Sequence, residues 1–435
     1  MTPGSGGATQ EEMAPLDQAP TPVHPRVYGA PWARARFGAE ADRCFAALHR
    51  CDPLADAVVE ALAASAGSPG HLDLPALWRA WSEGGEALAK VGNAAGLSEA
   101  AAATLGALFA ETSTLPEWAA SLDTSSARRL FERVGIAGGL TLALRCLPGG
   151  YLAPAGNKAL AFSGRLREQA PRRLAETTRF VAAVCEPGGL EPGAEGWVIT
   201  LHVRIMHAQV RHLVRASGRW DAAAWAEPIN QHDMLATMLL FSEVFIGGVE
   251  RMGFVVAPEE AEAWVALWRL AAWLMGTEAA LLPRDFAHAQ ALRLLIEDTQ
   301  GPGDADSRAL AEALVGGRSP VDRSAASPRG ARAWVVRHAG EQLAQLRGAF
   351  ATGLCRFLMG ERAAAGLGLG PTPVFDSIFA SVPALIGSFE RARTLVPALE
   401  DEARRRGAAY WRWVVDASLA GVPASFERPA RLGAR

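Results

Sequence analysis

Three evenly spaced histidines are the residues of this chain best suited to metal chemistry. His202, His207 and His212 lie five residues apart in a stretch whose apolar pattern predicts a helix over Glu195–Ala216. Five residues turn an α-helix through about 500°, so successive histidines point about 140° apart. They therefore cannot bind one metal ion together, and at most one of them can face a given pocket.

His207 has the neighbours that best suit a cofactor. One or two turns away on its own face lie aliphatic and arginine side chains, namely Val203, Arg204, Val210, Arg211 and Val214. Such a face suits haem, because iron binds imidazole, aliphatic groups pack on the porphyrin and guanidinium groups can pair with propionates. An ordinary core histidine between two surface arginines has the same spacing and is the more common arrangement. The pattern alone leaves both interpretations open.

The other reactive residues form no recognisable motif. The five cysteines are scattered and lack zinc-site spacing, so we expect reduced core thiols at Cys44, Cys51, Cys146, Cys185 and Cys355. The glycine-rich segments follow no predicted strand, no G-x-S-x-G sequence occurs, and no paired Glu-x-x-His motifs suggest a di-iron bundle. These observations argue against dinucleotide-binding, serine-hydrolase and di-iron functions.

Helical periodicity dominates from about Pro31 onward, and no alternating run typical of a strand persists. Helix-start residues and Gly/Pro breaks predict helices over Ala33–His49, Pro53–Ala64, Leu74–Val91, Ser98–Glu111, Ser125–Leu147, Pro171–Glu186, Glu195–Ala216, Gln231–Met252, Pro258–Met275, Pro283–Thr299, Arg329–Met359 and Pro383–Arg405. The expected fold is all-α, with one large helical domain over residues 31–412. A disordered tail (1–30) would precede it and an irregular extension (413–435) would follow it.

Composition limits the partners and the cellular locations that we expect for the protein. A net charge of -3 and a pI of about 6.3 provide no basic surface for nucleic acid. The polar N-terminus has no basic segment followed by an apolar one, so we expect no signal peptide and a cytoplasmic location. The most apolar stretch, Met234–Val249, is short and flanked by charges. A buried core helix therefore explains it better than a transmembrane segment.

The segment around His207 resembles the rubber-oxygenase (latex-clearing protein, MpaB-type) family. The resemblance is carried by Arg204-Ile-Met206-His207-Ala208 with Arg211, by Trp220-Asp221 and by Pro228-Ile-Asn-Gln231. Further similar pieces are Gly150-Tyr151, Pro154–Lys158, Arg173–Thr177 and Asp52–Ala57. The similarity is strongest over roughly a hundred residues in the centre of the chain.

This resemblance implies a b-type haem in a globin-like helical core, with His207 as the proximal iron ligand. Val203, Met206, Arg204 and Arg211 would then contact the cofactor. Arg173 and Thr177 match the family's distal residues, on the helix that precedes the His207 helix in the chain.

Four positions qualify or depart from the family pattern. Glu176 replaces a lysine that can cap the iron in the latex-clearing branch, so a lysine-ligated state is in doubt. Asn157 stands where that branch has a proposed glutamate base, and Lys158 is the nearest lysine. His232 replaces an acidic residue after Asn-Gln, as a hydrogen-bond partner or as a local variant.

The function implied is a haem-dependent oxygenase that uses dioxygen on a small, apolar, unsaturated substrate of isoprenoid or natural-product type. Rubber itself is not the expected substrate, because no export signal is recognised. A non-catalytic haem sensor or carrier is the alternative that the departures at Glu176 and Asn157 favour. A helical scaffold without haem is a third possibility, and the sequence does not indicate the oligomeric state.

Overall fold

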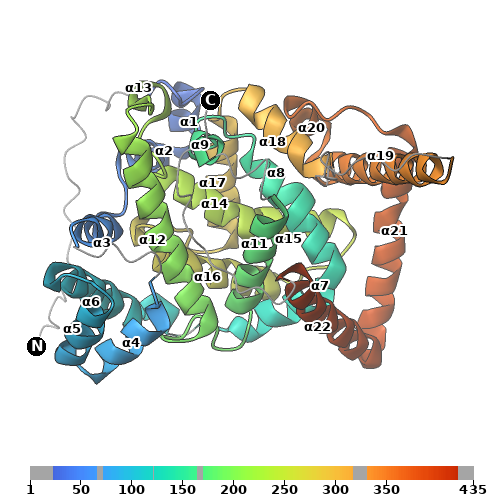
Figure 1. Ribbon diagram of the computed structural model, residues 1–435. Coiled ribbons are helices and arrows are strands. Elements are labelled where there is room, and N and C mark those ends of the chain that lie inside the picture. Colours follow the sequence, from blue (N-terminus) through green and yellow to red (C-terminus); the bar gives the residue numbers. More distant parts are fainter. Residues whose placement is uncertain (1–22, 66–71, 121, 164–169, 317–330, 420–435) are drawn as a thin grey trace, which may run out of the picture.

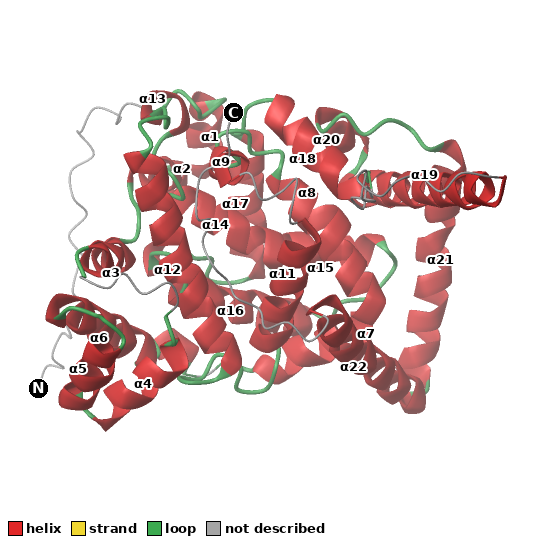
Figure 2. Cartoon of the chain, viewed as in Figure 1, coloured by secondary structure: helices red, strands yellow, loops and turns green. Residues whose placement is uncertain are grey.

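The computed structural model describes residues 23–65, 72–120, 122–163, 170–316 and 331–419. Within these ranges the chain forms helices joined by turns and loops, and no strand occurs (Figures 1 and 2). The expected all-α fold is therefore confirmed. The side chains of residues 163, 170–174, 331–341, 418 and 419 lie outside this description.

The N-terminal helices are shorter than the sequence pattern predicted. They are α1 (Ala30–Phe37), α2 (Ala39–Ala46), α3 (Pro53–Ala63), α4 (Leu74–Glu83), α5 (Gly85–Ala94) and α6 (Glu99–Ser113). Gly38 and Gly84 divide two of the predicted helices, because their φ values of 54° and 127° are incompatible with a continuous helix. The predicted disordered tail is wrong for residues 23–30, since Arg26 is buried and its Nη2 lies 2.6 Å from Asp233 Oδ1. Residues 1–22 lie outside the described part.

The central helices carry the residues singled out above. They are α7 (Thr124–Thr141), the π-helix η3 (Leu142–Cys146), α8 (Leu147–Gly150), α9 (Lys158–Ser163), α11 (Ala170–Val184), α12 (Glu195–Ala216), α13 (Ala222–Trp225), α14 (Gln231–Phe241), α15 (Glu243–Arg251), α16 (Pro258–Leu274) and α17 (Phe286–Asp298). The predicted bounds of α12 match the structure. The main core lies between α12, α14 and α16 and includes the fully buried indole rings of Trp197, Trp264 and Trp268.

The C-terminal helices form one edge of the molecule (Figure 1). They are α18 (Ala305–Val315), α19 (Ala331–Met359), α20 (Glu361–Gly366), α21 (Pro373–Leu395) and α22 (Pro397–Leu419). The predicted helix start at Pro383 is wrong, because this proline lies inside α21 and the break comes at Val396. The predicted irregular extension is wrong for residues 413–419, which continue α22, and residues 420–435 lie outside the described part.

The segment Gln231–Arg251 is long and apolar enough to cross a membrane, and it comprises α14 and α15. Its most apolar window is 61% buried inside the protein. Ser242 interrupts it with a φ of −102° and a ψ of −89°. These features are those of two consecutive core helices.

Candidate functional site

Close packing fixes α12 against its neighbours near its N-terminal end. The Trp197 Nε1 donates a hydrogen bond to the Thr112 carbonyl at 3.2 Å. A Cβ at Gly196 would lie 2.7 Å from the Ala183 carbonyl oxygen, so only glycine lets α11 and α12 approach this closely. This contact fixes the position of α11 relative to α12 along the direction of the helix axes.

The three histidines of α12 occupy three different environments, as their helical rotation requires. His202 is within hydrogen-bond distance of the carbonyls of Val198 at 3.1 Å and Leu72 at 3.2 Å. His212 is exposed, whereas His207 is half-buried and lines a pocket. His207 is therefore the histidine of this helix that faces a described cavity.

An apolar arc of half-buried side chains continues from His207 along α12. Val203, Met206 and Val210 all have intermediate exposure, while Ile205 and Ala208 on the opposite side are buried. These half-buried aliphatic groups form an apolar surface beside the imidazole, against which a further apolar group could pack. An iron porphyrin fits such a set of residues, because the ring supplies four nitrogens and needs one axial ligand from the protein.

The N-terminal part of α11, which carries the predicted distal residues, lies beside the part of α12 that carries His207. Helices α11 and α12 run antiparallel and touch where Gly196 meets Ala183. At 1.5 Å rise per residue in both helices, Arg173 lies level with about Met206, next to His207 in the chain. Thr177 is exposed and Glu176 is half-buried.

Thr177 also marks a change in the packing of α11. It shares a helix face with Val181 and Val184, which are 0% and 1% exposed. This face of α11 is therefore covered by the rest of the protein near its C-terminal end and exposed to solvent at Thr177. The catalytic roles predicted for Arg173, Glu176 and Thr177 stay predictions, and the side chain of Arg173 is outside the description.

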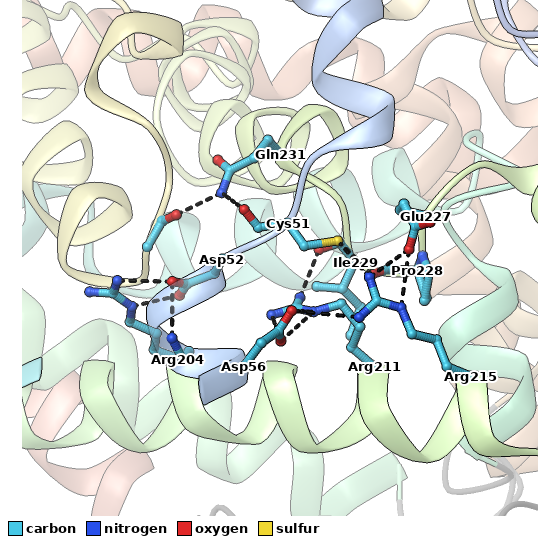
Figure 3. Close-up of polar contacts among 12 residues, drawn as sticks. Cys51, Asp52, Asp56, Arg204, Arg211, Arg215, Glu227, Pro228, Ile229 and Gln231 are labelled. Carbon is cyan, nitrogen blue, oxygen red and sulfur yellow. Dashed lines mark hydrogen bonds and ion pairs between the residues drawn. The ribbon is translucent and has the colours of Figure 1, made fainter. Parts of the chain in front are cut away.

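Arg204 is held by two carboxylates, of which Figure 3 shows Asp52. Its Nε lies 2.6 Å from Asp52 Oδ2 and its Nη1 lies 2.8 Å from Glu111 Oε1. Burial lowers the pKa of this guanidinium, but the hydrogen bond and charge of Asp52 outweigh that effect and raise it. Asp52 also caps α3 by accepting a hydrogen bond from the Ala55 N–H at 3.2 Å.

Arg211 makes an equivalent contact one turn further along α3. Its Nη2 lies 2.6 Å from Asp56 Oδ1, and its Nη1 donates to the Ile229 carbonyl at 3.0 Å (Figure 3). We expected Arg204 and Arg211 to be available for haem propionates. The structure instead gives both guanidinium groups protein carboxylates as partners, because Asp52 and Asp56 at the start of α3 face them. Their binding to a propionate stays a prediction.

A glycine leaves room for the Asp52–Arg204 pair. Gly276 has a φ of +88°, and a Cβ there would lie 2.1 Å from Asp52 Oδ2 and 2.7 Å from Arg204 Nε. A side chain at this position would displace the carboxylate from the guanidinium. Gly276 is therefore part of the arrangement, although nothing in its sequence context indicated this.

Gln231 joins the same region to α14. Its Nε2 donates hydrogen bonds to the carbonyls of Cys51 at 3.0 Å and Gly276 at 2.8 Å, and its Oε1 accepts from the Glu278 N–H at 2.9 Å. All of the polar atoms of this amide group are thus used to hold backbone segments. In the Asn-Gln sequence noted above, the glutamine therefore has a structural role.

The pocket beside His207 is small. Its free volume is about 10 Å³, and it is lined by Asp52, Arg204, His207, Arg211, Ile229, Gln231, Met234, Met275 and Gly276. A single water molecule needs a space of about this size, whereas pockets that hold cofactors usually measure about 300–1,000 Å³. This pocket therefore has room for a water molecule and does not hold a porphyrin.

The remaining predicted residues lie in local structural roles. The His232 ring is buried, and burial lowers its pKa to about 4; its Nδ1 lies 3.2 Å from the Cys44 carbonyl oxygen. Asn157 is buried and donates to the Tyr151 carbonyl at 2.8 Å. Lys158 lies 2.5 Å from Asp304 and 2.7 Å from Asp306, the ion pair that a surface lysine would form.

The fold and the site define an all-helical protein whose central helix presents the half-buried His207 imidazole beside an apolar arc. Residues 127–388 match the family described as "ER-bound oxygenase mpaB/B'/Rubber oxygenase, catalytic domain". Because this range is more than half of the chain, the protein belongs to this oxygenase family, and the resemblance stated above is confirmed.

Two relatives illustrate the extent of the similarity. The chain is 25% identical over 231 residues to the rubber oxygenase of Streptomyces sp. (strain K30), across 52% of this chain and 51% of that protein. It thus spans about half the length of this relative. A solved structure of the latex clearing protein LCP in the closed state covers 70% of this chain and 79% of its own, with 20% identity and a TM-score of 0.48.

Proposed function

We propose that this protein is a haem b-dependent oxygenase in which His207 is the proximal iron ligand. The observation that carries the proposal is the placement of His207, half-buried at the end of an apolar arc and level with the open part of α11. Membership of an oxygenase family supports the same assignment.

The residues of α12 would hold the cofactor in distinct ways. The His207 imidazole nitrogen would bind iron, while Val203, Met206 and Val210 pack against the porphyrin plane. These arc residues are the ones that would hold the porphyrin, because the pocket on the Arg204 side is too small for it. When bound, the haem would supply the capacity to bind and activate dioxygen.

The surrounding residues would orient the imidazole and shape the distal side. The ion pairs of Arg204 and Arg211 with α3 fix the rotation of α12 about its axis, and with it the direction of His207. Arg173, Thr177 and Glu176 on α11 are the proposed distal residues, able to donate or accept hydrogen bonds near the reacting atoms. No lysine is assigned to the iron, since Lys158 is bound by two aspartates.

The proposed substrate is a small apolar molecule with a carbon–carbon double bond, of isoprenoid or other natural-product type. The apolar arc offers no charged group to such a molecule, and exclusion of water would favour it there. We further propose that the protein acts in the cytoplasm, with dioxygen as co-substrate and without nucleic acid as a partner.

The decisive experiment compares His207→Ala with His202→Ala and His212→Ala. We expect the purified wild-type protein and the two control variants to contain one haem per chain, with normal reduced and carbon monoxide spectra. The His207→Ala variant should lose haem or hold it with an altered spectrum, because only this imidazole forms the metal bond. Equal haem content and identical spectra in all three variants would refute the assignment.

A non-catalytic haem carrier or sensor is the second candidate, favoured by two observations. Asn157 replaces the expected base and binds its own loop, and Lys158 is held by aspartates. A haem-loaded protein that forms no oxidised product from unsaturated apolar compounds, under oxygen and with a reductant, would support this alternative. Product formation that disappears in Thr177→Val would support the oxygenase.

A further inference from the structure

Helix α21 lies on the outer edge of the molecule, where one of its sides is left uncovered (Figure 1). The inner side is well packed: Phe379 is 5% exposed and Glu390 is 0% exposed. The backbone of Pro383 on this side touches Gly253, where a Cβ would lie 2.4 Å from the Pro383 carbonyl oxygen. The helix is thus firmly placed, and its outer side faces away from the body.

The outer side of α21 is apolar to an unusual degree. Val374, Ile378, Leu385 and Leu395 are 70%, 50%, 75% and 81% exposed. Between Pro373 and Phe389, all within the described residues, the exposed side chains are proline, valine, isoleucine, leucine, phenylalanine, serine and alanine. The one charged side chain there that reaches solvent is Asp376, which is 34% exposed and lies about 160° around the helix from Val374. Exposed apolar surfaces of this kind mark sites of association.

The spacing of these residues fits another helix. Val374, Ile378, Ser381, Leu385, Ser388, Ala392 and Leu395 follow one another at alternating intervals of four and three residues. This interval keeps the side chains in one seam along a neighbouring helix, as in coiled coils. The small serine and alanine side chains in the seam allow two backbones to approach closely.

We propose that α21 is a homodimer interface, in which the seam packs antiparallel against the same seam of a second copy of this chain. A two-fold axis brings identical surfaces together, so an uncharged seam meets no like charge. The exposed charge nearest to the seam is Arg391, at the C-terminal end of the helix. An antiparallel pair separates the two copies of Arg391, whereas a parallel pair would bring them together.

A lipid surface is the competing occupant, and the composition of the seam argues against it. Interfacial helices carry bulky apolar groups on one side and several lysines or arginines on the other. The seam here includes two serines and an alanine, which gain little from lipid but permit close helix packing. Leu343 and Leu346, in the middle of α19, are a second pair of exposed leucines, at 58% and 57% exposure.

The test is the mass of the full-length protein in solution, measured by sedimentation velocity at micromolar concentration. We expect a mass near twice the 45.9 kDa of one chain. Ile378→Glu and Leu385→Glu should each raise the dimer dissociation constant by about tenfold or more, because each buries a charge in the seam. Val91→Glu, on α5 at the far side of the molecule, is the matched control and should stay dimeric.

Cross-linking tests the direction of the two helices. Chains with Val374→Cys mixed with chains with Leu395→Cys should form mixed cross-links with a short bismaleimide, while neither variant should cross-link to itself. Self-cross-linking of Val374→Cys would overturn the antiparallel arrangement. A monomeric wild-type protein would overturn the proposal, and so would one whose Leu385→Glu variant stays dimeric. Co-sedimentation of a monomer with phosphatidylserine vesicles would assign the surface to lipid instead.

Discussion

Two clusters of buried arginines and carboxylates hold this molecule together, and they differ in what surrounds them. The Arg204 cluster (Asp52, Asp56, Arg204 and Arg211) joins α3 to α12 and lines the pocket beside His207. The Arg133 cluster (Arg133, Glu260, Glu390 and Arg393) joins α7, α16 and α21. Both place arginine side chains in the interior, with exposures of 4% at Arg204 and 1% at Arg133.

The difference lies in access rather than in burial. In the Arg133 cluster, Glu390 is 0% exposed and is bound by Arg133 at 2.7 Å and by Arg393 at 3.0 Å, so the charges are enclosed. In the Arg204 cluster, Asp56 and Glu111 keep 21% and 45% exposure, and a glycine borders the ion pair. A buried ion pair alone therefore does not mark a functional site. Its position against a pocket and an imidazole makes the Arg204 cluster the candidate site.

Breaking the Arg133 cluster should have the largest effect on stability and none on the binding of the proposed haem. Arg133→Met removes the shorter of the two arginine contacts of the fully buried Glu390, at 2.7 Å, and leaves this carboxylate with Arg393. Loss of one partner from a buried ion pair costs about 3–5 kcal/mol of unfolding free energy. We expect this loss in urea titrations, with haem per folded chain unchanged. A changed haem spectrum in this variant would remove the distinction between the two clusters.

Acid should weaken the Arg204 side of the molecule through His232, which adjoins Gln231. Its pKa is about 4 in the folded protein against an ordinary value of 6.5, so the unfolded chain binds the proton more readily. Stability from this group is present above pH 6.5 and is lost as the pH falls toward 4, by up to about 3 kcal/mol.

Unfolding free energies measured between pH 7 and 4 check this expectation. His232→Gln should remove this part of the pH dependence, while His212→Gln, at an exposed position of the neighbouring helix, should retain it. Arg133→Met should also retain it, because its cluster lies elsewhere. An unaltered pH profile in His232→Gln would show that another group titrates.

Weakening the Arg204 cluster should have a smaller effect on stability but a visible one on the haem. Asp52→Asn keeps the size of the side chain and removes its charge, while Arg204 keeps Glu111 as a partner. We expect a loss of about 1.5–3 kcal/mol in unfolding free energy. The haem spectrum should shift as well, because α12 is less firmly oriented.

Asp42→Asn is the matched control for this change. It breaks the exposed pair with Arg34, in which Asp42 is 49% exposed, and exposed pairs contribute about 1 kcal/mol or less. A variant at Asp52 that loses stability but keeps the wild-type spectrum would show that the Arg204 cluster is purely structural.

The sequence predicted the helices well where one helix has one apolar stripe, as in α12. It failed where a single residue decides the break. Gly38, Gly84 and Ser242 interrupt runs whose apolar pattern continues on both sides, so periodicity alone cannot detect them. Pro383 is typical of a helix start, but in the structure it lies within α21.

The candidate site shows the same division. The rotation of the three histidines follows from helical geometry alone, and the structure places them in three environments as that rotation requires. The partners of Arg204 and Arg211 could not be predicted in this way, because Asp52 and Asp56 lie about 150 residues earlier in the chain. The sequence shows only two aspartates, four residues apart, at the start of a helix that begins with proline. Nothing in that pattern indicates that the fold brings them to the arginines of α12.

The Asp52–Arg204 and Asp56–Arg211 pairs also determine whether a fragment of this protein can be expected to keep its structure. Both aspartates precede the family-matched range 127–388, while both arginines lie within it. A fragment limited to that range would expose two interior cations to solvent or leave them uncompensated. Transplanting the matched range into another helical framework would require an acidic helix start, with carboxylates one turn apart, supplied from outside it.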